Sequence, residues 1–338
     1  MRRTGATLVE VLVAIFVMGI GLIAILALFP LGVIRMAQAI QDGRTGNIAF
    51  NAEAIATMKL LGQDASGNPE SVRHDATFIS TCQNPGGGLG TATAQGPSYP
   101  VFIDPIGYRS AAATGFQNWL TGTPGTIPRI SLNSIQNSLT PDSMSMRWFS
   151  FRDEIVFDIN GLPQYVPPTP IGMPPPPPFF YRETRYSWAY LCQLPKLADP
   201  QVVNMAVVVF NRRTMGMGTG GIPLSEYSYS STFDTTSNVV RLTIPQNGVS
   251  PIPPPIRLGE WVLDCTPVAN PPSAHGYFYR VVSITDSGQD NNVPPNRLFD
   301  LEVQSPFRGF APGGTYAGQT MILEGVVEVF ERNSGRQP

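Results

Sequence analysis

The N-terminus of this chain joins a short basic leader to a long apolar segment that contains a single carboxylate. The leader carries Arg2 and Arg3 and ends at Gly5, and the apolar run extends from Ala6 to Phe29, about 24 residues. As an α-helix, a run of this length spans the hydrocarbon core of a bilayer. Glu10 lies inside the run, five residues after the glycine. Because a carboxylate is costly in such a segment, Glu10 is a candidate functional residue that requires a partner.

Two simpler interpretations compete for this segment. A secretory signal peptide has an apolar core of roughly 7–15 residues followed by a small-x-small cleavage site. The run here is longer, and no such site follows it. A plain membrane anchor explains the length of the run but not the spacing of Gly5 and Glu10.

The leader, Gly5, the apolar run and Glu10 together closely resemble the N-terminus of type IV prepilins and type II secretion pseudopilins. The resemblance covers roughly the first 60 residues, and the Val11–Ile25 segment is most similar to minor pilins and minor pseudopilins. It implies that a prepilin peptidase cleaves between Gly5 and Ala6, that Ala6 becomes N-methylated, and that Glu10 guides filament assembly. The family usually has Phe or Met after the glycine, so Ala6 departs from that pattern.

The helix is predicted to continue beyond the apolar run. Apolar residues recur at helical spacing as far as Met58, and Gly62 is a suitable C-terminal stop. A helix from about Thr7 to Leu61 would be on the order of 80 Å long. Pro30 and the glycines weaken this helix locally. One interpretation is that transmembrane helices ordinarily tolerate Gly and Pro. The other, implied by the resemblance to pilins, is that the helix unwinds here during assembly.

The rest of the chain predicts a polar, glycine-rich linker followed by strands. No strand–helix–strand alternation appears, so an antiparallel sheet is expected. The predicted organisation is a leader at 1–5, a helix at 6–61 with its transmembrane part at about 6–29, a loop or linker at 62–99, and a β-rich head at 100–338. The fold class expected is α+β, a long N-terminal transmembrane and amphipathic helix followed by an antiparallel, pilin-like head. The predicted strands are Val101–Asp104, Met146–Phe157, Arg185–Cys192, Val202–Phe210, Val239–Ile244, Glu260–Cys265, Tyr277–Ile284, Leu298–Val303 and Met321–Phe330.

Composition and motifs argue against several other functions. A net charge of −2 and a charged fraction of 14% do not suit nucleic-acid binding. No nucleophile elbow or zinc-protease motif occurs, so neither an enzyme nor a cofactor is expected. His74 and His275 are expected at the surface or in loops. The oxygen-rich loop at 286–292 lacks the EF-hand spacing, and its interpretations are a solvated turn or a calcium site.

The three cysteines have no metal-site spacing. Cys82, Cys192 and Cys265 are far apart in the sequence, and this spacing argues against a zinc or redox motif. Two arrangements fit the sequence. In one, two cysteines form a disulfide and the third is a free thiol; in the other, all three are buried thiols.

The sequence thus predicts a structural subunit, a minor pilin or pseudopilin of a type IV pilus or type II secretion-like filament. Its expected partners are other subunits, bound through the N-terminal helix, the prepilin peptidase and inner-membrane lipid. Its expected location is the inner membrane, single-pass, with a cytoplasmic N-terminus and a periplasmic head, and then the filament. The alternative is a membrane-tethered envelope module with a β-rich, ligand-binding head.

Overall fold

The computed structural model describes residues 8–56, 76–86, 89–104, 127–130, 149–150, 186–199, 202–213, 225–245, 256–292 and 295–334. The chain divides into two compact units, Met1–Asn47 and Ile48–Pro338.

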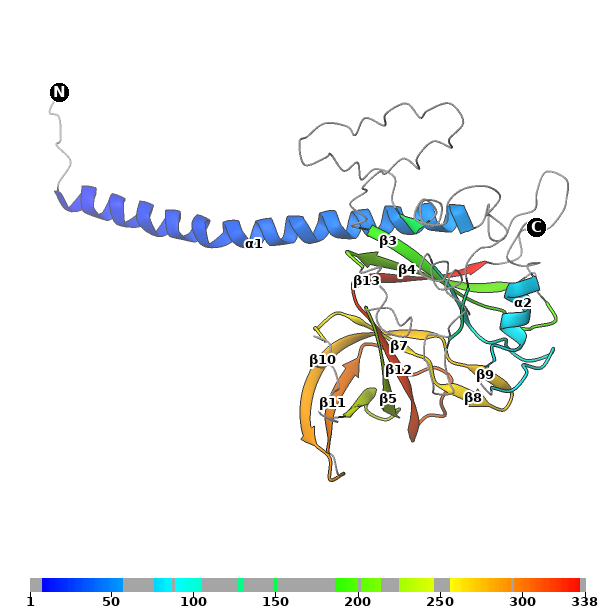
Figure 1. Ribbon diagram of the computed structural model, residues 1–338. Coiled ribbons are helices and arrows are strands. Elements are labelled where there is room, and N and C mark those ends of the chain that lie inside the picture. The colour runs from blue at the N-terminus through cyan, green and yellow to red at the C-terminus, as the bar shows by residue number, and fades with distance from the viewer. Residues whose placement is uncertain are drawn as a thin grey trace, which may run out of the picture. The chain divides into compact units, whose positions relative to one another are not determined.

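The described part of the first unit is helical. It belongs to α1 (Leu8–Ile55), a helix of 48 residues that runs through Pro30 without interruption (Figure 1). A proline removes one backbone hydrogen bond, and the turns on either side of Pro30 remain helical. Of the helix predicted to end near Leu61, residues 57–61 lie outside the described residues, as does the predicted leader.

The predicted membrane-spanning helix is not found in the described part of the chain. Among the described residues, no helix combines the length and the apolarity that a membrane span requires. The predictions of a transmembrane segment at about 6–29 and of a single-pass inner-membrane location with a periplasmic head therefore do not hold.

The second unit contains a five-stranded sheet with the strand order β13-β4-β3-β1-β2. Its pairs are antiparallel except β1 with β2, which is parallel. The bounds are β1 (Val101–Ile103), β2 (Arg129–Ile130), β3 (Tyr186–Gln193), β4 (Val203–Asn211) and β13 (Val326–Ser334).

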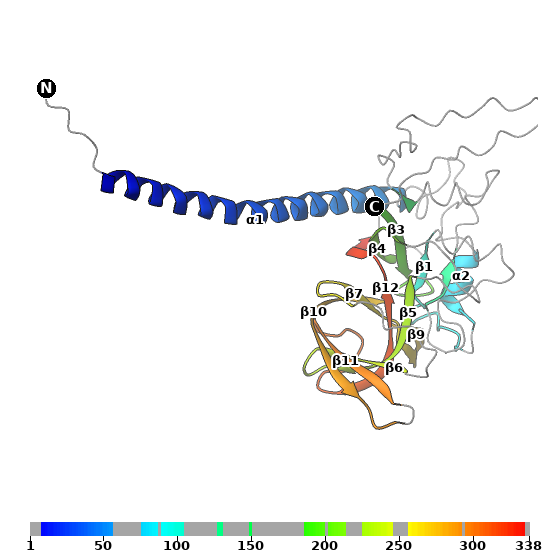
Figure 2. The same cartoon turned by 60° about the vertical axis from the view of Figure 1, so that its left-hand side comes forward.

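Six further strands close into a barrel in the order β10-β11-β6-β5-β12-β7, which both views place beside the five-stranded sheet (Figures 1 and 2). A two-stranded β8–β9 ribbon and the short helix α2 complete the described elements, and α2 lies in the segment predicted as linker. The bounds are α2 (Ala76–Gln83), β5 (Glu226–Asp234), β6 (Val239–Pro245), β7 (Trp261–Asp264), β8 (Pro267–Ala269), β9 (Pro272–Ala274), β10 (Tyr277–Gln289), β11 (Asn296–Val303) and β12 (Thr315–Leu323).

The five-stranded sheet is buried on both faces, as the apolar run of β3 requires. Trp188 and Tyr190 point to one face, where they pack with Ile48 and Ala52 from the last turns of α1. Tyr190 Oη also donates a hydrogen bond of 2.8 Å to the Ala52 carbonyl. Leu191 and its neighbours on the other face pack against side chains of β7, β10 and β12. A separate apolar core fills the barrel.

The predicted α+β, pilin-like class is wrong, because the described chain is mostly β and six of its strands form a closed barrel. Two local features account for the difference. The strand β5 is rich in Ser and Tyr rather than in alternating aliphatic residues, and it completes the barrel by pairing with β6 and β12.

The second feature is a turn inside the predicted strand Met321–Phe330. The strand β12 ends in the barrel at Leu323, the chain turns at Gly325, and β13 then begins in the five-stranded sheet. Gly325 has a φ of 84°, and a Cβ there would lie 2.7 Å from the Asn211 carbonyl oxygen. Only glycine fits this position without strain.

Candidate functional site

The three residues to which the sequence assigns a role, Gly5, Ala6 and Glu10, all lie at the start of the chain. Gly5 and Ala6 lie outside the described residues. Glu10 is exposed in the first turn of α1, where a negative charge interacts favourably with the helix dipole. The described structure leaves their roles in processing and assembly as predictions.

Around Glu10, α1 carries an unusual amount of exposed apolar surface. Its large apolar side chains between Leu8 and Ile40, outside the four positions whose side chains are not described, are 47–79% exposed. We call this set the α1 surface. Consecutive residues such as Val11, Leu12 and Val13 point about 100° apart, so the α1 surface surrounds the helix. A helix that is apolar on all sides is normally buried, and patches this large mark interaction sites.

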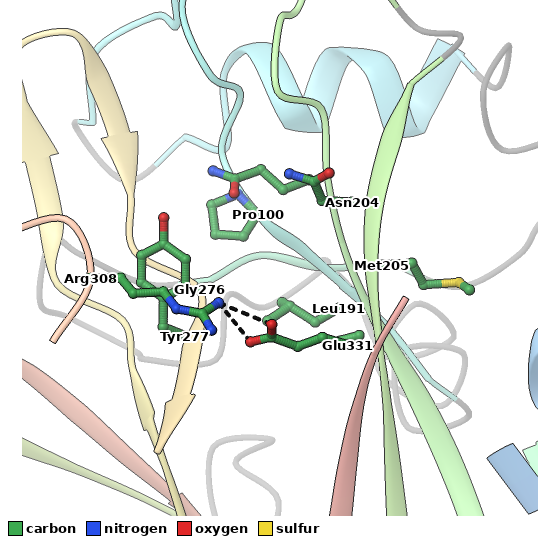
Figure 3. Close-up of a pocket in the computed structure, with 10 residues that line it drawn as sticks. Pro100, Leu191, Asn204, Met205, Gly276, Tyr277, Arg308 and Glu331 are labelled. Atoms are coloured by element: carbon green, nitrogen blue, oxygen red, sulfur yellow. Dashed lines mark hydrogen bonds and ion pairs between the residues drawn. The ribbon is translucent and has the colours of Figure 1, made fainter. Parts of the chain in front are cut away.

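The second unit holds a pocket of about 120 Å³ between the five-stranded sheet and the barrel (Figure 3). Its floor follows from strand register, because Leu191 pairs with Ala206 and Ala206 pairs with Glu331. These three side chains therefore share one face of the sheet. The side chain of Ala206 is a single methyl group between the longer side chains of Leu191 and Glu331, so the surface is hollow at this position.

Polar groups surround this floor. Gln193 and Asn204 are paired in the next row of the sheet, and Tyr277 and Arg308 approach from the barrel side (Figure 3). Arg308 Nη1 donates to both Glu331 carboxylate oxygens, at 2.8 and 3.0 Å. The hydrogen bond to Glu331 raises the pKa of Arg308 further, so the guanidinium stays charged.

Arg308 projects from a well-anchored loop. Its backbone N–H donates to Tyr279 Oη at 2.8 Å. The preceding residue, Phe307, packs edge-on against Phe233 and Tyr279, and Phe310 stacks on Phe233. These contacts fix the backbone at Arg308, and the ion pair with Glu331 orients its exposed guanidinium.

Next to this loop lies a buried Asp–His pair. His275 Nδ1 is 2.8 Å from Asp264 Oδ2, and Thr266 donates to the other carboxylate oxygen through its N–H and its hydroxyl. Such a pair also occurs in hydrolase triads, where the second ring nitrogen faces a nucleophile. Here His275 Nε2 faces Gly309, where a built Cβ would lie only 2.5 Å away. The pair therefore ties β7 to the loop between β9 and β10. His275 was expected at the surface or in a loop; it lies in a loop, and its side chain is buried.

Four charged side chains form the buried charge cluster: Asp104, Arg129, Arg213 and Glu226. Each side chain is at most 3% exposed. Arg213 Nη2 lies 2.8 Å from both Asp104 Oδ2 and Glu226 Oε1, and Arg129 contacts the same two carboxylates. Two positive and two negative charges balance. Asp104 and Arg213 lie just after β1 and β4, and Arg129 lies on β2, so the cluster joins this end of the sheet to Glu226 on the barrel strand β5.

Of the oxygen-rich segment at 286–292, residues 286–289 belong to β10 and residues 290–292 follow this strand. The backbone N–H of Asn296 donates to Asp290 at 2.7 Å and is the main cause of that carboxyl's lowered pKa. Asp286 pairs with Arg297, which lowers the pKa of Asp286. Among the described residues, no three His, Cys, Asp or Glu side chains are grouped as a metal site would require.

The three cysteines are buried free thiols. Burial raises the pKa of Cys82 to about 12, and it raises the pKa values of Cys192 and Cys265 as well. Because the thiolate is the reactive form, we expect almost no reaction of the folded chain with a disulfide reagent at pH 8. Unfolding in guanidinium without reductant should release three reactive thiols. Rapid reaction of the native chain, or fewer than three thiols after unfolding, would contradict this assignment.

Sequence reasoning missed the pocket and both buried polar groups. In the sequence, Arg308 stands between Phe307 and a Gly309–Phe310 pair, which by itself does not indicate a pocket. Its partner Glu331 lies 23 positions away, and only the fold brings them together.

Comparison with known proteins assigns this chain to no family. No protein-family model and no curated protein matches this chain. One solved structure with partial similarity is the Phage phi92 endosialidase, with 9% identity and a TM-score of 0.18. The similarity covers 44% of this chain and 18% of that one, so this chain spans less than a fifth of its length. An overlap this slight does not show a shared fold.

Proposed function

We infer that this chain is a structural subunit that assembles into a filament of the type IV pilus or type II secretion class, as a minor pilin or pseudopilin. The observation that carries the proposal is the α1 surface, which leaves side chains such as Leu8, Phe16 and Met18 from 68 to 79% exposed in the isolated chain. Burying one such side chain stabilises an assembly by about 1.5–3 kcal/mol. Even a fraction of these residues would supply a large driving force for association.

The partner chemistry that fits the α1 surface is another helix of the same kind. Residues 11–34 contain no charged side chain, so a partner needs apolar groups rather than complementary charges. At Gly19, Gly21 and Gly32 a Cβ would meet nothing within 4 Å, so a neighbouring helix can approach the backbone closely there. The resemblance of the first 60 residues to prepilins supports the same partner, namely the N-terminal helices of other subunits.

The test is the mass of the chain recovered from assembled filaments. We expect the chain to co-purify with sheared filaments and to begin at Ala6, because the uncleaved leader would carry Arg2 and Arg3 into an apolar helix bundle at a high desolvation cost. A Gly5→Val variant should stay uncleaved and be absent from the filament fraction, since a branched side chain does not fit a cleavage site shaped for glycine. The control is Gly43→Ala, whose added methyl group meets nothing within 4 Å.

Two results would contradict the proposal. One is a chain recovered only as a monomer from cells that assemble filaments. The other is an uncleaved Gly5→Val chain that enters the filament fraction as efficiently as the unmodified one.

A further inference from the structure

The pocket between the sheet and the barrel is independent of α1, and it points to an activity beyond assembly. We propose that it binds one pyranose ring of a neutral saccharide. The inference rests on the shape of the floor, on the polar groups at the rim, and on their balance of charge.

The floor suits the apolar face of a sugar ring. Leu191 and Ala206 provide aliphatic groups side by side, and Pro100 extends this surface next to Gly276. Gly276 allows this approach, because a Cβ there would lie 2.9 Å from the Pro100 Cβ. A volume of about 120 Å³ is enough to take one face of a single ring, and the rest of the saccharide would lie outside the pocket.

The rim suits hydroxyl groups, which both donate and accept hydrogen bonds. Arg308 supplies donors, Glu331 supplies acceptors, and the exposed Asn204 amide supplies both. Gln193 Nε2 already donates to the Ser98 carbonyl at 2.8 Å, which holds this side chain in place. Pockets with apolar walls and a few fixed polar groups are the usual form of a specific small-ligand site.

Charge disfavours an anionic ligand. Both Nη1 contacts of Arg308 go to the Glu331 carboxylate, so the pair is neutral as a unit. An anion would have to compete with Glu331 for the guanidinium and would be repelled by that carboxylate.

A peptide in extended form is disfavoured for another reason. Such peptides bind by adding a strand to an open sheet edge. The strands under the pocket, β3 and β4, each have a partner on both sides. The floor therefore offers side chains but no backbone hydrogen-bonding groups.

The experiment is saturation-transfer NMR on the purified full-length chain, kept in a detergent without a sugar headgroup so that α1 is covered. The probes are glucose, galactose, mannose and N-acetylglucosamine, with glucuronic acid and a short alanine peptide as comparison ligands. We expect transfer to at least one neutral sugar. An Ala206→Phe variant, whose ring fills the hollow, should abolish the transfer, and Arg308→Ala should weaken binding about tenfold.

The matched control is Arg297→Ala. Arg297 is also exposed, paired with a carboxylate (Asp286) and placed over an aromatic ring (Phe299, 5.1 Å), but it lies on β11 outside the pocket. Sugar binding should be unchanged in this variant. Absence of transfer to every neutral sugar, a preference for glucuronic acid or the peptide, or equal transfer in Ala206→Phe would each overturn the proposal.

Discussion

Replacing Arg213 by methionine is expected to lower the free energy of unfolding of the second unit by about 3–5 kcal/mol. The substitution keeps most of the side-chain volume but leaves the carboxylates of Asp104 and Glu226 with one guanidinium between them. Both carboxylates are at most 2% exposed, so water cannot compensate for the lost charge. Arg213 also lies 4.1 Å from the centre of the Phe210 ring, and this cation–π contact is lost as well.

Guanidinium unfolding followed by tryptophan fluorescence measures this effect, since Trp188 is buried in the sheet. The control is Arg297→Met, which removes an exposed ion pair and should leave the unfolding midpoint almost unchanged. The double variant Arg213→Met, Glu226→Gln restores the charge balance and should recover part of the loss. An unchanged midpoint in Arg213→Met would show that the buried charge cluster does not hold the sheet to the barrel.

The sequence predicted those elements whose signal is local. The strands β3, β4 and β7 are dense in Val, Tyr, Trp and Leu and are bounded by turn residues, so their existence and approximate limits could be predicted. The run of apolar residues after Leu8 likewise indicated a helix. These patterns reflect the chain's own backbone preferences and burial, and they need no knowledge of distant residues.

The barrel could not be predicted in the same way. Its closure depends on β5, in which Ser228, Ser230 and Ser231 replace the aliphatic pattern of a typical buried strand. It also depends on which strands pair, and β5 pairs with β12 more than 80 positions later in the chain (Glu226 with Leu323). Pairing between distant strands is set by the packing of the whole domain and leaves little trace in any short window.

The sites follow the same rule. The carboxylate of Asp104 and the guanidinium of Arg213 lie 109 positions apart in the sequence and meet only in the folded unit. The floor of the pocket exists because Ala206 falls between Leu191 and Glu331 in register, a relation invisible without the sheet. By contrast, the predicted roles of Gly5, Ala6 and Glu10 rest on their spacing along the chain alone, and they stay predictions.

Replacing Glu10 by leucine is expected to reduce incorporation into filaments at least tenfold. Cleavage after Gly5 would create an amine at Ala6, with a typical pKa of about 7.7–8.0, so that most of it is cationic at neutral pH. In a packed bundle of N-terminal helices this amine can pair with the Glu10 carboxylate of a neighbouring subunit. At about 4 Å and an effective dielectric of 20, the attraction is on the order of 4 kcal/mol before the desolvation cost is subtracted.

The pairing matters most for register, because it fixes how far one helix is displaced along the next. Leucine preserves the apolar character of α1 but removes this constraint. Incorporation is measured by immunoblotting sheared filaments against total cell protein. The control is Asp42→Leu, which removes another exposed carboxylate from α1, 32 positions further along, and should leave incorporation unchanged. If Glu10→Leu entered filaments as well as Asp42→Leu does, Glu10 would be a tolerated polar residue, and the contacts of the α1 surface alone would have to set the register.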